Sequence, residues 1–483
     1  MAGAGDPVGD APARQPARRT ADLRALLDDV AARAADYRDG VAASAVFPPG
    51  DPAAAVRTGL GALRDEGADP AVALAELAAA VEPGLVATTG PRYFGFVVGG
   101  ALDAATAADM LTVAWDQPAF NPVMSPAAAV VEDVTGAWLK DLLGLPETAS
   151  FGFVTGAQGA NTVGLAAARH RVLADAGWDV ERDGLGGAPA IRVLASRERH
   201  ATVDRALRLL GLGAAAVRPI DTDDQGRIDV GVLAGALEQG GPGPAIVCLQ
   251  AGNVNTGACD DLAAGIDLAH AHGAWVHVDG AFGLWAAASP ATRHLVAGLA
   301  AADSWGTDGH KWLNVPYDSG YAFCADAEAH RAAMAYTAAY VSGQGMGEVR
   351  APGDHVPESS RRARGFATWA ALRQLGRTGV ADLVERCCAL ARRFADQVSD
   401  ADGVAVVNDV VLNQVLVRFG QDDAMTDAVV AAVQRSGECW MGATTWHGQR
   451  LMRISVSNWS TTAPDVDRSV AAISAALDRT APS

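Results

Sequence analysis

The sequence lacks several features that identify whole classes of protein. No uninterrupted apolar run reaches the ~18 residues of a membrane-spanning helix, and the N-terminus has no apolar signal core. The six cysteines show no Cys-x-x-Cys spacing, and several lie in apolar patterns where cysteine behaves as a small hydrophobic residue. We therefore expect a protein of the reducing cytoplasm that is neither secreted nor anchored to a membrane.

Positive charge is also scarce. The 483 residues include 38 Lys and Arg against 56 Asp and Glu, which gives a formal net charge of −18. This field repels phosphate backbones and anionic lipids, so it disfavours a nucleic-acid or membrane partner. Any phosphate that this chain binds must be held locally, by backbone amides. The 50% hydrophobic content is enough for a large core, which we expect to divide into two or three domains.

Composition and periodicity divide the chain into four segments. Residues 1–20 are rich in Ala, Gly, Pro and Arg without periodicity, and we expect them to be disordered. Residues 21–90 have helical spacing and predict a helical N-terminal arm. Residues 91–363 predict a large α/β domain, and residues 364–483 a small α+β C-terminal domain.

Strands and helices alternate within the large domain, which is typical of a mostly parallel sheet with crossover helices. The expected strands are residues 151–155, 191–196, 245–250, 274–278 and 320–324. Between the last two strands, residues 290–302 predict a helix and residues 304–309 a turn-rich run.

One aspartate and one lysine suggest the chemistry of the large domain. Asp279, in His277-Val278-Asp279, ends an apolar strand at the edge where open α/β sheets place their ligands. Lys311, in Gly309-His310-Lys311-Trp312, lies on a later loop that can return to that edge. A lysine amine forms a Schiff base with the aldehyde of pyridoxal phosphate, and an aspartate keeps the pyridine nitrogen protonated so that the ring can take up electrons. The pair therefore suggests a pyridoxal phosphate enzyme, whereas an arbitrary Asp and Lys would be a turn cap and a surface charge.

A loop of small residues could hold the phosphate of such a cofactor. Residues 155–161, Thr-Gly-Ala-Gln-Gly-Ala-Asn, follow the first strand of the domain and lead into a helix expected at 162–173. Free backbone N–H groups and the helix dipole bind phosphate without a basic patch. The loop has neither the Gly-Lys-Ser/Thr of a Walker motif nor a Gly-x-Gly-x-x-Gly fingerprint, and a plain strand-to-helix turn is the alternative.

Histidines allow two further interpretations. His200 follows a strand, where it could stack on a planar ring or transfer a proton, or could simply begin a helix. His270, His272 and His277 with Asp279 include two i,i+2 pairs that could ligate a metal. The metal interpretation is the weaker one, because no second carboxylate and no His-Glu-x-x-His group accompanies them.

These motifs together resemble the group II pyridoxal phosphate decarboxylases, the family of aromatic-L-amino-acid and glutamate decarboxylases. Residues 303–312, Asp-Ser-Trp-Gly-Thr-Asp-Gly-His-Lys-Trp, resemble the family's signature around the Schiff-base lysine. Residues 277–281, His-Val-Asp-Gly-Ala, resemble the segment with the aspartate and with the small residue under the ring, here Ala281. The resemblance extends from about residue 21 to the C-terminus and implies the fold-type I transferase-like α/β fold.

The resemblance implies roles for further residues. His200 would stack on the cofactor ring, Gly156, Ala157 and Gln158 would surround the phosphate, and His310 would lie beside the Schiff base.

Two positions depart from the family pattern. Asn253 stands where relatives often have threonine, and Asp308 where many have asparagine near the phosphate. Their contacts to the cofactor are left open by these departures.

A tyrosine distinguishes decarboxylases from related enzymes. In the family, a mobile loop after the lysine supplies a tyrosine that reaches the partner subunit's site and is thought to protonate the carbanion left by CO₂. Tyr340, in Ala338-Ala339-Tyr340-Val341, occupies this place, although it could be an ordinary amphipathic tyrosine on a Gly-rich loop. Relatives with phenylalanine there form aldehydes, so the tyrosine favours amine formation. The resemblance also implies a homodimer with shared active sites.

The resemblance thus predicts pyridoxal phosphate-dependent decarboxylation of an L-amino acid to its amine. An aromatic substrate is favoured, and acidic or diamino acids remain open, as do an aldehyde synthase, an aminotransferase and a carbon-carbon lyase. The part of the family that lines the pocket for the substrate side chain is resembled by Pro91, Tyr93, Phe94 and the stretch Trp115-Asp116-Gln117. Arg364 and Arg453 could bind a carboxylate, although bracing of the small domain is the preferred interpretation.

Overall fold

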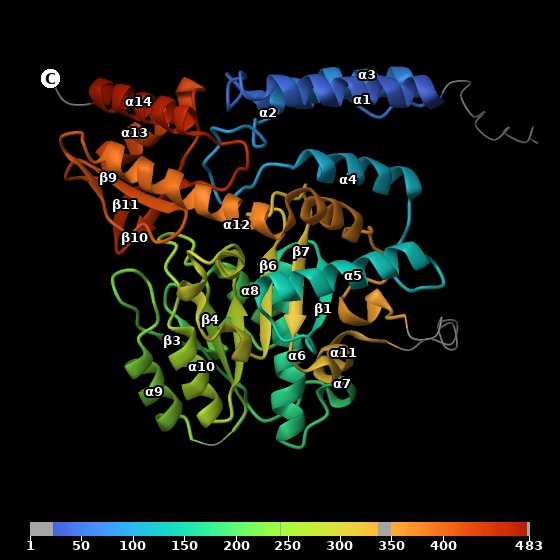
Figure 1. The fold of residues 1–483 in the computed structure, drawn as a ribbon, viewed down its shortest axis with the longest axis vertical. Helices are drawn as coiled ribbons and strands as arrows, with labels where there is room; N and C mark the ends of the chain where they lie inside the picture. The colour runs from blue at the N-terminus through green and yellow to red at the C-terminus, as the bar shows by residue number, and fades with distance from the viewer. Residues whose placement is uncertain (1–22, 242, 337–348, 481–483) are drawn as a thin grey trace, which may run out of the picture. The chain divides into compact units, whose positions relative to one another are not determined.

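The computed structural model describes residues 23–241, 243–336 and 349–480 (Figure 1). These residues form two compact units, 23–44 with Pro48–Val86 and Ala45–Phe47 with the described residues from Ala87 onward. Within the described ranges, no helix combines the length and the apolar content that crossing a membrane requires.

The first unit is helical. It contains α1 (Leu23–Gly40), α2 (Pro52–Leu60) and α3 (Pro70–Val81). Asp51 and Asp69 precede α2 and α3, and each carboxylate accepts a first-turn amide while a proline occupies the first helical position. These caps explain why two Ala-rich segments begin helices at these points.

A seven-stranded sheet forms the centre of the second unit. Its strand order is β1-β7-β6-β5-β4-β2-β3. The strands are β1 (Ser150–Val154), β2 (Arg192–Ser196), β3 (Val217–Ile220), β4 (Ala245–Gln250), β5 (Trp275–Asp279), β6 (Ser304–Asp308) and β7 (Gly320–Cys324). Only β7 runs against its neighbours, so six strands share one direction. The predicted mostly parallel α/β sheet is confirmed.

Helices connect the strands and cover the sheet, and Figure 1 shows α9 and α10 side by side on one flank. The helices of this part are α4 (Asp103–Trp115), α5 (Pro126–Leu143), α6 (Ala157–Asp175), α7 (Val180–Asp183), α8 (Ala201–Leu209), α9 (Val230–Gln239), α10 (Leu262–Ala271) and α11 (Ala327–Met334), of which α6 to α10 lie between strands of the sheet. Helix α6 packs on β5, β6 and β7 at short range. A Cβ atom on Gly164 would lie 2.6 Å from Nδ1 of His277, and a Cβ on Gly306 would lie 2.7 Å from Oδ1 of Asn161. Glycine at both positions therefore lets helix and sheet approach closely.

The C-terminal part is a smaller α+β layer. A four-stranded antiparallel sheet of order β10-β11-β9-β8 packs with three helices. Its elements are α12 (Gly365–Val398), β8 (Val404–Val406), β9 (Gln414–Phe419), α13 (Asp423–Ser436), β10 (Gly442–Trp446), β11 (Gln449–Ser455) and α14 (Ala463–Thr480). Helix α12 is interrupted at Gly376, whose φ of 63° is left-handed.

Three expectations about local structure are wrong. Residues 304–309 are not a turn-rich run, because Ser304–Asp308 form β6, which is buried along its whole length between β5 and β7. Residues 290–302 contain only short 3₁₀ turns, since Gly298 adopts a φ of 84° between them. Helix α6 begins at Ala157 rather than near residue 162.

Candidate active site

Four strand ends bring the candidate residues to one edge of the sheet. Strands β1, β2, β5 and β6 run in the same direction, and each is followed by a candidate segment. These segments begin at Gly156, His200, Asp279 and Asp308. The carboxyl-terminal edge of parallel strands is where open α/β sheets bind ligands.

Asp279 is the last residue of β5, and its side chain is held by two donors. It is 5% exposed. Nδ2 of Asn161 donates to Oδ2 at 3.0 Å, and the backbone N–H of Ala281 donates to Oδ1 at 3.2 Å. The carboxylate is therefore fixed in orientation beneath the segment that contains Ala281.

Lys311 lies three residues beyond the end of β6, the neighbour of β5. Its Nζ is 2.9 Å from Oδ2 of Asp308. The segment before α4 packs closely against the Lys311 backbone, because a Cβ on Gly99 would lie 1.9 Å from the carbonyl oxygen of Lys311. The backbone N–H of Gly99 also donates to the carbonyl of His310 at 3.3 Å. The lysine thus projects from a backbone that is tightly held.

The Asp308 carboxylate joins three parts of the site. It is 2% exposed. Its Oδ1 accepts the N–H of Ala157 at 2.5 Å and lies 3.4 Å from Nε2 of His310, while Oδ2 pairs with Lys311. One carboxylate therefore links the N-terminus of α6, the His310 ring and the lysine amine.

His310 is fixed by its backbone surroundings. Nδ1 accepts the N–H of Ser319 at 3.1 Å, so the ring proton of the neutral form is on Nε2, toward Asp308. The ring stacks on Tyr317 with centroids 4.3 Å apart. Burial lowers the pKa of His310, although the nearby Asp308 carboxylate opposes the effect.

The loop before α6 has the shape of an anion cradle. Gly156 is the N-cap of α6 and supplies no side-chain cap. A Cβ on Gly156 would lie 3.0 Å from the His310 ring and 3.1 Å from Oδ1 of Asp308, so a larger residue here would need these side chains to shift. Since the N–H of Ala157 is taken by Asp308, the amides of Gln158 and the following glycine are the remaining first-turn donors.

His200 is the N-cap of α8. Its Nδ1 accepts the N–H of Thr202 at 3.3 Å and lies 2.9 Å from the Thr202 hydroxyl. Part of the side chain remains exposed. Desolvation lowers the pKa of His200, with Lys311 and Arg453 lowering it further and the carboxylate of Asp279 opposing them. The charged groups of the site therefore act on one another around this ring.

Two predicted residues stand apart from this cluster. Asn253 is buried, and its side chain is bonded to backbone groups: Nδ2 donates to the carbonyl of Glu198, two residues before His200, at 3.1 Å, and Oδ1 accepts the N–H of Asn255 at 2.9 Å. Tyr340 lies outside the described residues.

The two arginines differ in their partners. Arg364 pairs with Asp318 at 2.6 Å, as expected of a brace. Arg453 is half-buried and donates only to the carbonyls of Val254 and Phe96, both at 3.2 Å. No ion pair joins Arg453 to a carboxylate within the described part of the chain, and burial lowers its pKa.

The segment expected to line a substrate pocket divides into two parts. Tyr93 and Phe96 both stack on Trp440, with centroids 5.2 and 5.7 Å away. Phe94 is 1% exposed and packs edge-on against Phe394, and its place in the substrate pocket stays a prediction. Alternation along the chain directs Phe94 into the core.

Sequence reasoning missed Asn161 and Thr202, which contact Asp279 and His200. Their signal was a polar residue among the small residues of α6 and a threonine two positions after a candidate histidine. His277, which the sequence suggests as a metal ligand, has its ring between Ser304 and Asn161. Among the residues that the structure describes, no cluster of three His, Cys, Asp or Glu could hold a metal ion.

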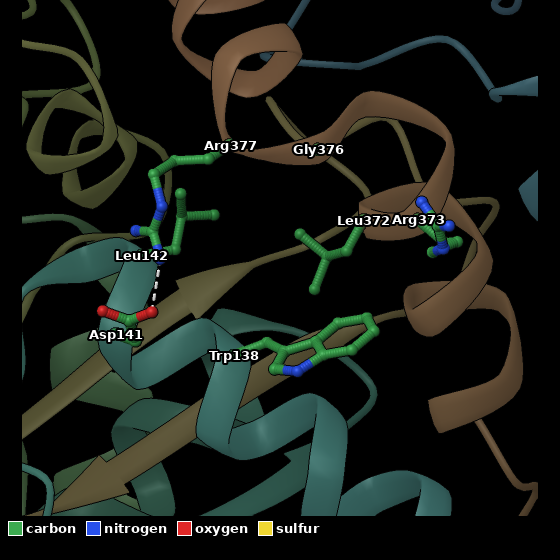
Figure 2. Close-up of a pocket in the computed structure, with 7 residues that line it drawn as sticks. All are labelled: Trp138, Asp141, Leu142, Leu372, Arg373, Gly376 and Arg377. Atoms are coloured by element: carbon green, nitrogen blue, oxygen red, sulfur yellow. Dashed lines mark hydrogen bonds and ion pairs between the residues drawn. The ribbon is translucent and has the colours of Figure 1, made fainter.

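Two cavities of the second unit lie elsewhere. Figure 2 shows a cavity of about 400 Å³ between α5 and α12, at the break in α12. It is lined by Trp138, Asp141, Leu142, Leu372, Arg373, Gly376 and Arg377. A second cavity of about 330 Å³ shares Asp141, Leu142 and Arg377 with it. Neither contains a strand-end residue of the candidate site.

Three comparisons relate the chain to known proteins. The family model described as the pyridoxal-dependent decarboxylase conserved domain matches residues 63–420. Tryptophan decarboxylase 1 of Oryza sativa subsp. japonica is 28% identical over 492 residues, which cover 94% of this chain and 93% of that protein. An acidic amino acid decarboxylase of Mus musculus is 27% identical over 324 residues, covering 66% and 58%. The crystal structure of Oryza sativa TDC with PLP and tryptamine has a TM-score of 0.88 and 25% identity, covering 98% of this chain and 99% of that one.

Proposed function

Because the chain belongs to the pyridoxal-dependent decarboxylase family, we propose that it converts an aromatic L-amino acid to the corresponding amine and CO₂. Membership confirms the predictions of a pyridoxal phosphate cofactor, an amino acid decarboxylase and the fold-type I architecture. The relatives act on aromatic or on acidic amino acids by name, so the choice between these substrates is the proposal.

The strand-end residues fit pyridoxal phosphate. When bound, this cofactor supplies an electron-accepting ring that stabilises the charge left by the departing carboxyl group. The Lys311 amine would hold it covalently, and the Asp279 carboxylate would accept a hydrogen bond from its protonated ring nitrogen. His200 would cover the ring, and the glycine cradle at Gly156 leaves space and amide donors for the phosphate.

Arg453 is suited to receive the α-carboxylate of the amino acid. Its guanidinium is half-buried, donates only to carbonyl groups and acts electrostatically on His200. A desolvated guanidinium gains most from an anionic partner, and a carboxylate matches its donor geometry. We therefore prefer this role to the bracing role expected from the sequence.

The observation that carries the aromatic preference is the balance of charge around His200. Lys311 and Arg453 are the cations that act on this ring. With Lys311 engaged by the cofactor, Arg453 is the cation left of this pair in the described part of the chain, and it would serve a single carboxylate. An acidic amino acid would need a second cation, and residues 337–348 contain no Lys or Arg. The Tyr93, Trp440 and Phe96 stack instead offers an aromatic wall, joined to Arg453 through the Phe96 carbonyl.

A homodimer with shared sites is supported by exposed apolar side chains on α4 and α5. Six of these are at least 40% exposed: Met110, Leu111, Val113, Trp115, Val130 and Val134. A monomer rarely exposes so many apolar side chains on two helices. In this assembly Tyr340 would protonate the substrate carbon in the partner's site. All six cysteines are free and buried, which supports a cytoplasmic location.

The sequence allows a sharp test of the cofactor site, because Lys140 and Lys311 are its only lysines. Borohydride reduction of the loaded protein followed by peptide mass spectrometry should find the cofactor on Lys311. The Lys311→Arg variant should lose this adduct, and the matched Lys140→Arg variant should keep it. An adduct on Lys140, or none on either lysine, would contradict the proposed site.

A product assay then tests the reaction and the substrate class. Tryptophan, tyrosine and phenylalanine are compared with aspartate, glutamate and 2,4-diaminobutyrate for release of CO₂ and amine. Faster release from an acidic or diamino acid would overturn the aromatic preference. Formation of an aldehyde with peroxide would identify an aldehyde synthase, and formation of an oxo acid would identify an aminotransferase. Loss of the side chain without release of CO₂ would identify a carbon-carbon lyase.

A further inference from the structure

A buried histidine that the proposed chemistry does not use lies behind Asp279. His277 is fully buried on β5. Its Nδ1 is 2.9 Å from Oγ of Ser304, and its Nε2 is 3.1 Å from Oδ1 of Asn161. Asn161 in turn contacts Asp279 and the hydroxyl of Thr202. Ser304, His277, Asn161 and Thr202 therefore form a continuous chain of hydrogen bonds, here named the orienting network.

Chemistry fixes the direction of every bond on the Asp279 side. A carboxylate only accepts, so the group of Asn161 that faces Asp279 must be the NH₂. The carbonyl oxygen of Asn161 then accepts from Nε2–H of His277, whose Nδ1 accepts the Ser304 hydroxyl proton. Trp275 Nε1–H completes the chain by donating to Ser304 at 3.0 Å. Burial lowers the pKa of His277 to about 4, which agrees with a neutral ring.

The other end of the network reaches His200. The second amide proton of Asn161 points to Oγ1 of Thr202 at 3.2 Å, so this hydroxyl accepts one bond and donates its own proton. Nδ1 of His200 lies 2.9 Å from it and also receives the Thr202 N–H. Nδ1 must therefore be unprotonated, and the proton of neutral His200 lies on Nε2.

The fold leaves little space for another arrangement. Asn161, His277 and Ser304 are each 0% exposed. Gly164 and Gly306 lie so close to the rings and amide of the network that a Cβ on either would clash. Each side-chain donor and acceptor of Asn161, His277 and Ser304 bonds to a partner, so these three side chains are held in one geometry.

We propose that Asn161 and Thr202 are positioning residues, which orient the Asp279 carboxylate and hold His200 as its Nε2–H tautomer through the orienting network. This inference rests on the roles of Asp279 and His200 in the proposed function. Partners behind a catalytic group fix its tautomer and orientation, and their loss commonly lowers activity by roughly 10- to 100-fold. The side-chain amide of Asn161 thus orients both the Asp279 carboxylate, which would accept from the cofactor's ring nitrogen, and, through Thr202, the His200 ring that would cover the cofactor.

Thr202→Val tests the link to His200, because it removes the hydroxyl at nearly constant volume. In the cofactor-free protein labelled with ¹⁵N-histidine, the His200 signals, assigned with His200→Gln, should show unprotonated Nδ1 in the wild type. Thr202→Val should move them toward a mixture of tautomers, and Thr202→Ser should restore them. Thr106→Val is the matched control, because the Thr106 hydroxyl donates to the carbonyl of Leu102, four residues earlier, and takes no part in the orienting network.

Kinetics provide the second measurement. With the substrate found in the product assay, Thr202→Val should lower kcat by roughly tenfold with a smaller change in KM, and Thr202→Ser should recover most of it. Asn161→Ala should weaken cofactor binding, measured by fluorescence titration, by a similar factor. Unchanged His200 tautomer and unchanged kcat in Thr202→Val would overturn the proposal. A wild type without decarboxylase activity would instead contradict the proposed function, because the tautomer measurement needs neither substrate nor cofactor.

Discussion

Two buried histidines should make the protein less stable as the pH falls from 7 to 5. His330 on α11 is fully buried, with Nδ1 2.8 Å from the Ser150 hydroxyl and Nε2 2.9 Å from the carbonyl of His355. The two rings meet edge to face with centroids 5.1 Å apart. Burial lowers the pKa of His330 to about 4, and burial together with the cation of Arg350 lowers the pKa of His355 to about 2.

The sign and size of the effect follow from proton binding. A histidine in the unfolded chain has a pKa of about 6.5. Below this pH the histidine is protonated in the unfolded chain, whereas in the folded protein it stays neutral until the pH reaches its lower folded-state pKa. The free energy of unfolding therefore decreases as the pH falls through this range. Each pH unit below about 6.5 costs about 1.4 kcal/mol per histidine. Between pH 7 and 5 the loss is thus about 2 kcal/mol for His330 and about as much for His355.

Urea denaturation followed by tryptophan fluorescence at the two pH values measures this loss. His330→Gln keeps a donor toward the carbonyl of His355 but does not titrate, so it should lose about 2 kcal/mol less than the wild type on acidification. His277, with a pKa of about 4, acts in the same direction, and Asp260, with a pKa raised by burial to about 6, acts in the opposite one. Both cancel in the difference. The exposed His294→Gln is the control, and equal losses in His330→Gln and wild type would refute the reasoning.

Two further predictions concern the scaffold of the site. Arg361→Met should destabilise the protein by about 3–5 kcal/mol in urea unfolding, because Glu132 is fully buried and would lose its bidentate partner at 2.8 Å. The double variant with Glu132→Gln should regain most of this loss. A small loss in the single variant would contradict the ion-pair argument. Gly99→Ala should reduce the amount of Lys311 adduct, measured by cofactor absorbance, because the new Cβ would lie 1.9 Å from the Lys311 carbonyl oxygen. Gly186→Ala, with open space around it, should bind the cofactor normally. Equal binding by both variants would contradict the argument from this contact.

Sequence patterns predict those strands whose hydrophobic character matches their burial. Residues 245–250 and 320–324 are apolar runs, and they form β4 and β7 with the expected bounds. Strand β6 was missed because Ser304-Trp-Gly-Thr-Asp reads locally as a turn. Its strand conformation comes from pairing with β5 and β7, a tertiary effect that overrides local propensity.

The site divides in the same way. Asp279 and Lys311 could be predicted because strand ends and a family signature mark them. Asn161 could not, since its role depends on α6 lying close enough to β5 for an amide to reach a carboxylate. Asp308 was expected near the phosphate, yet no pattern indicates that its carboxylate would bind the N–H of Ala157 and the amine of Lys311 together. Such contacts arise from packing between distant segments. The domain boundary at residue 364 and the role of Tyr340 stay predictions.

The charges of the site explain how an acidic protein can hold an anionic cofactor. Around His200, two carboxylates, Asp279 and Asp308, face two cations, Lys311 and Arg453, so the local balance is close to neutral despite the net charge of −18. Covalent attachment would remove the charge of Lys311, and we propose that Arg453 serves the substrate. The phosphate is then left to helix amides and the α6 dipole, one of whose amides Asp308 already occupies. We therefore expect cofactor retention to depend on the lysine bond and on the Asp279 contact more than on attraction for the phosphate.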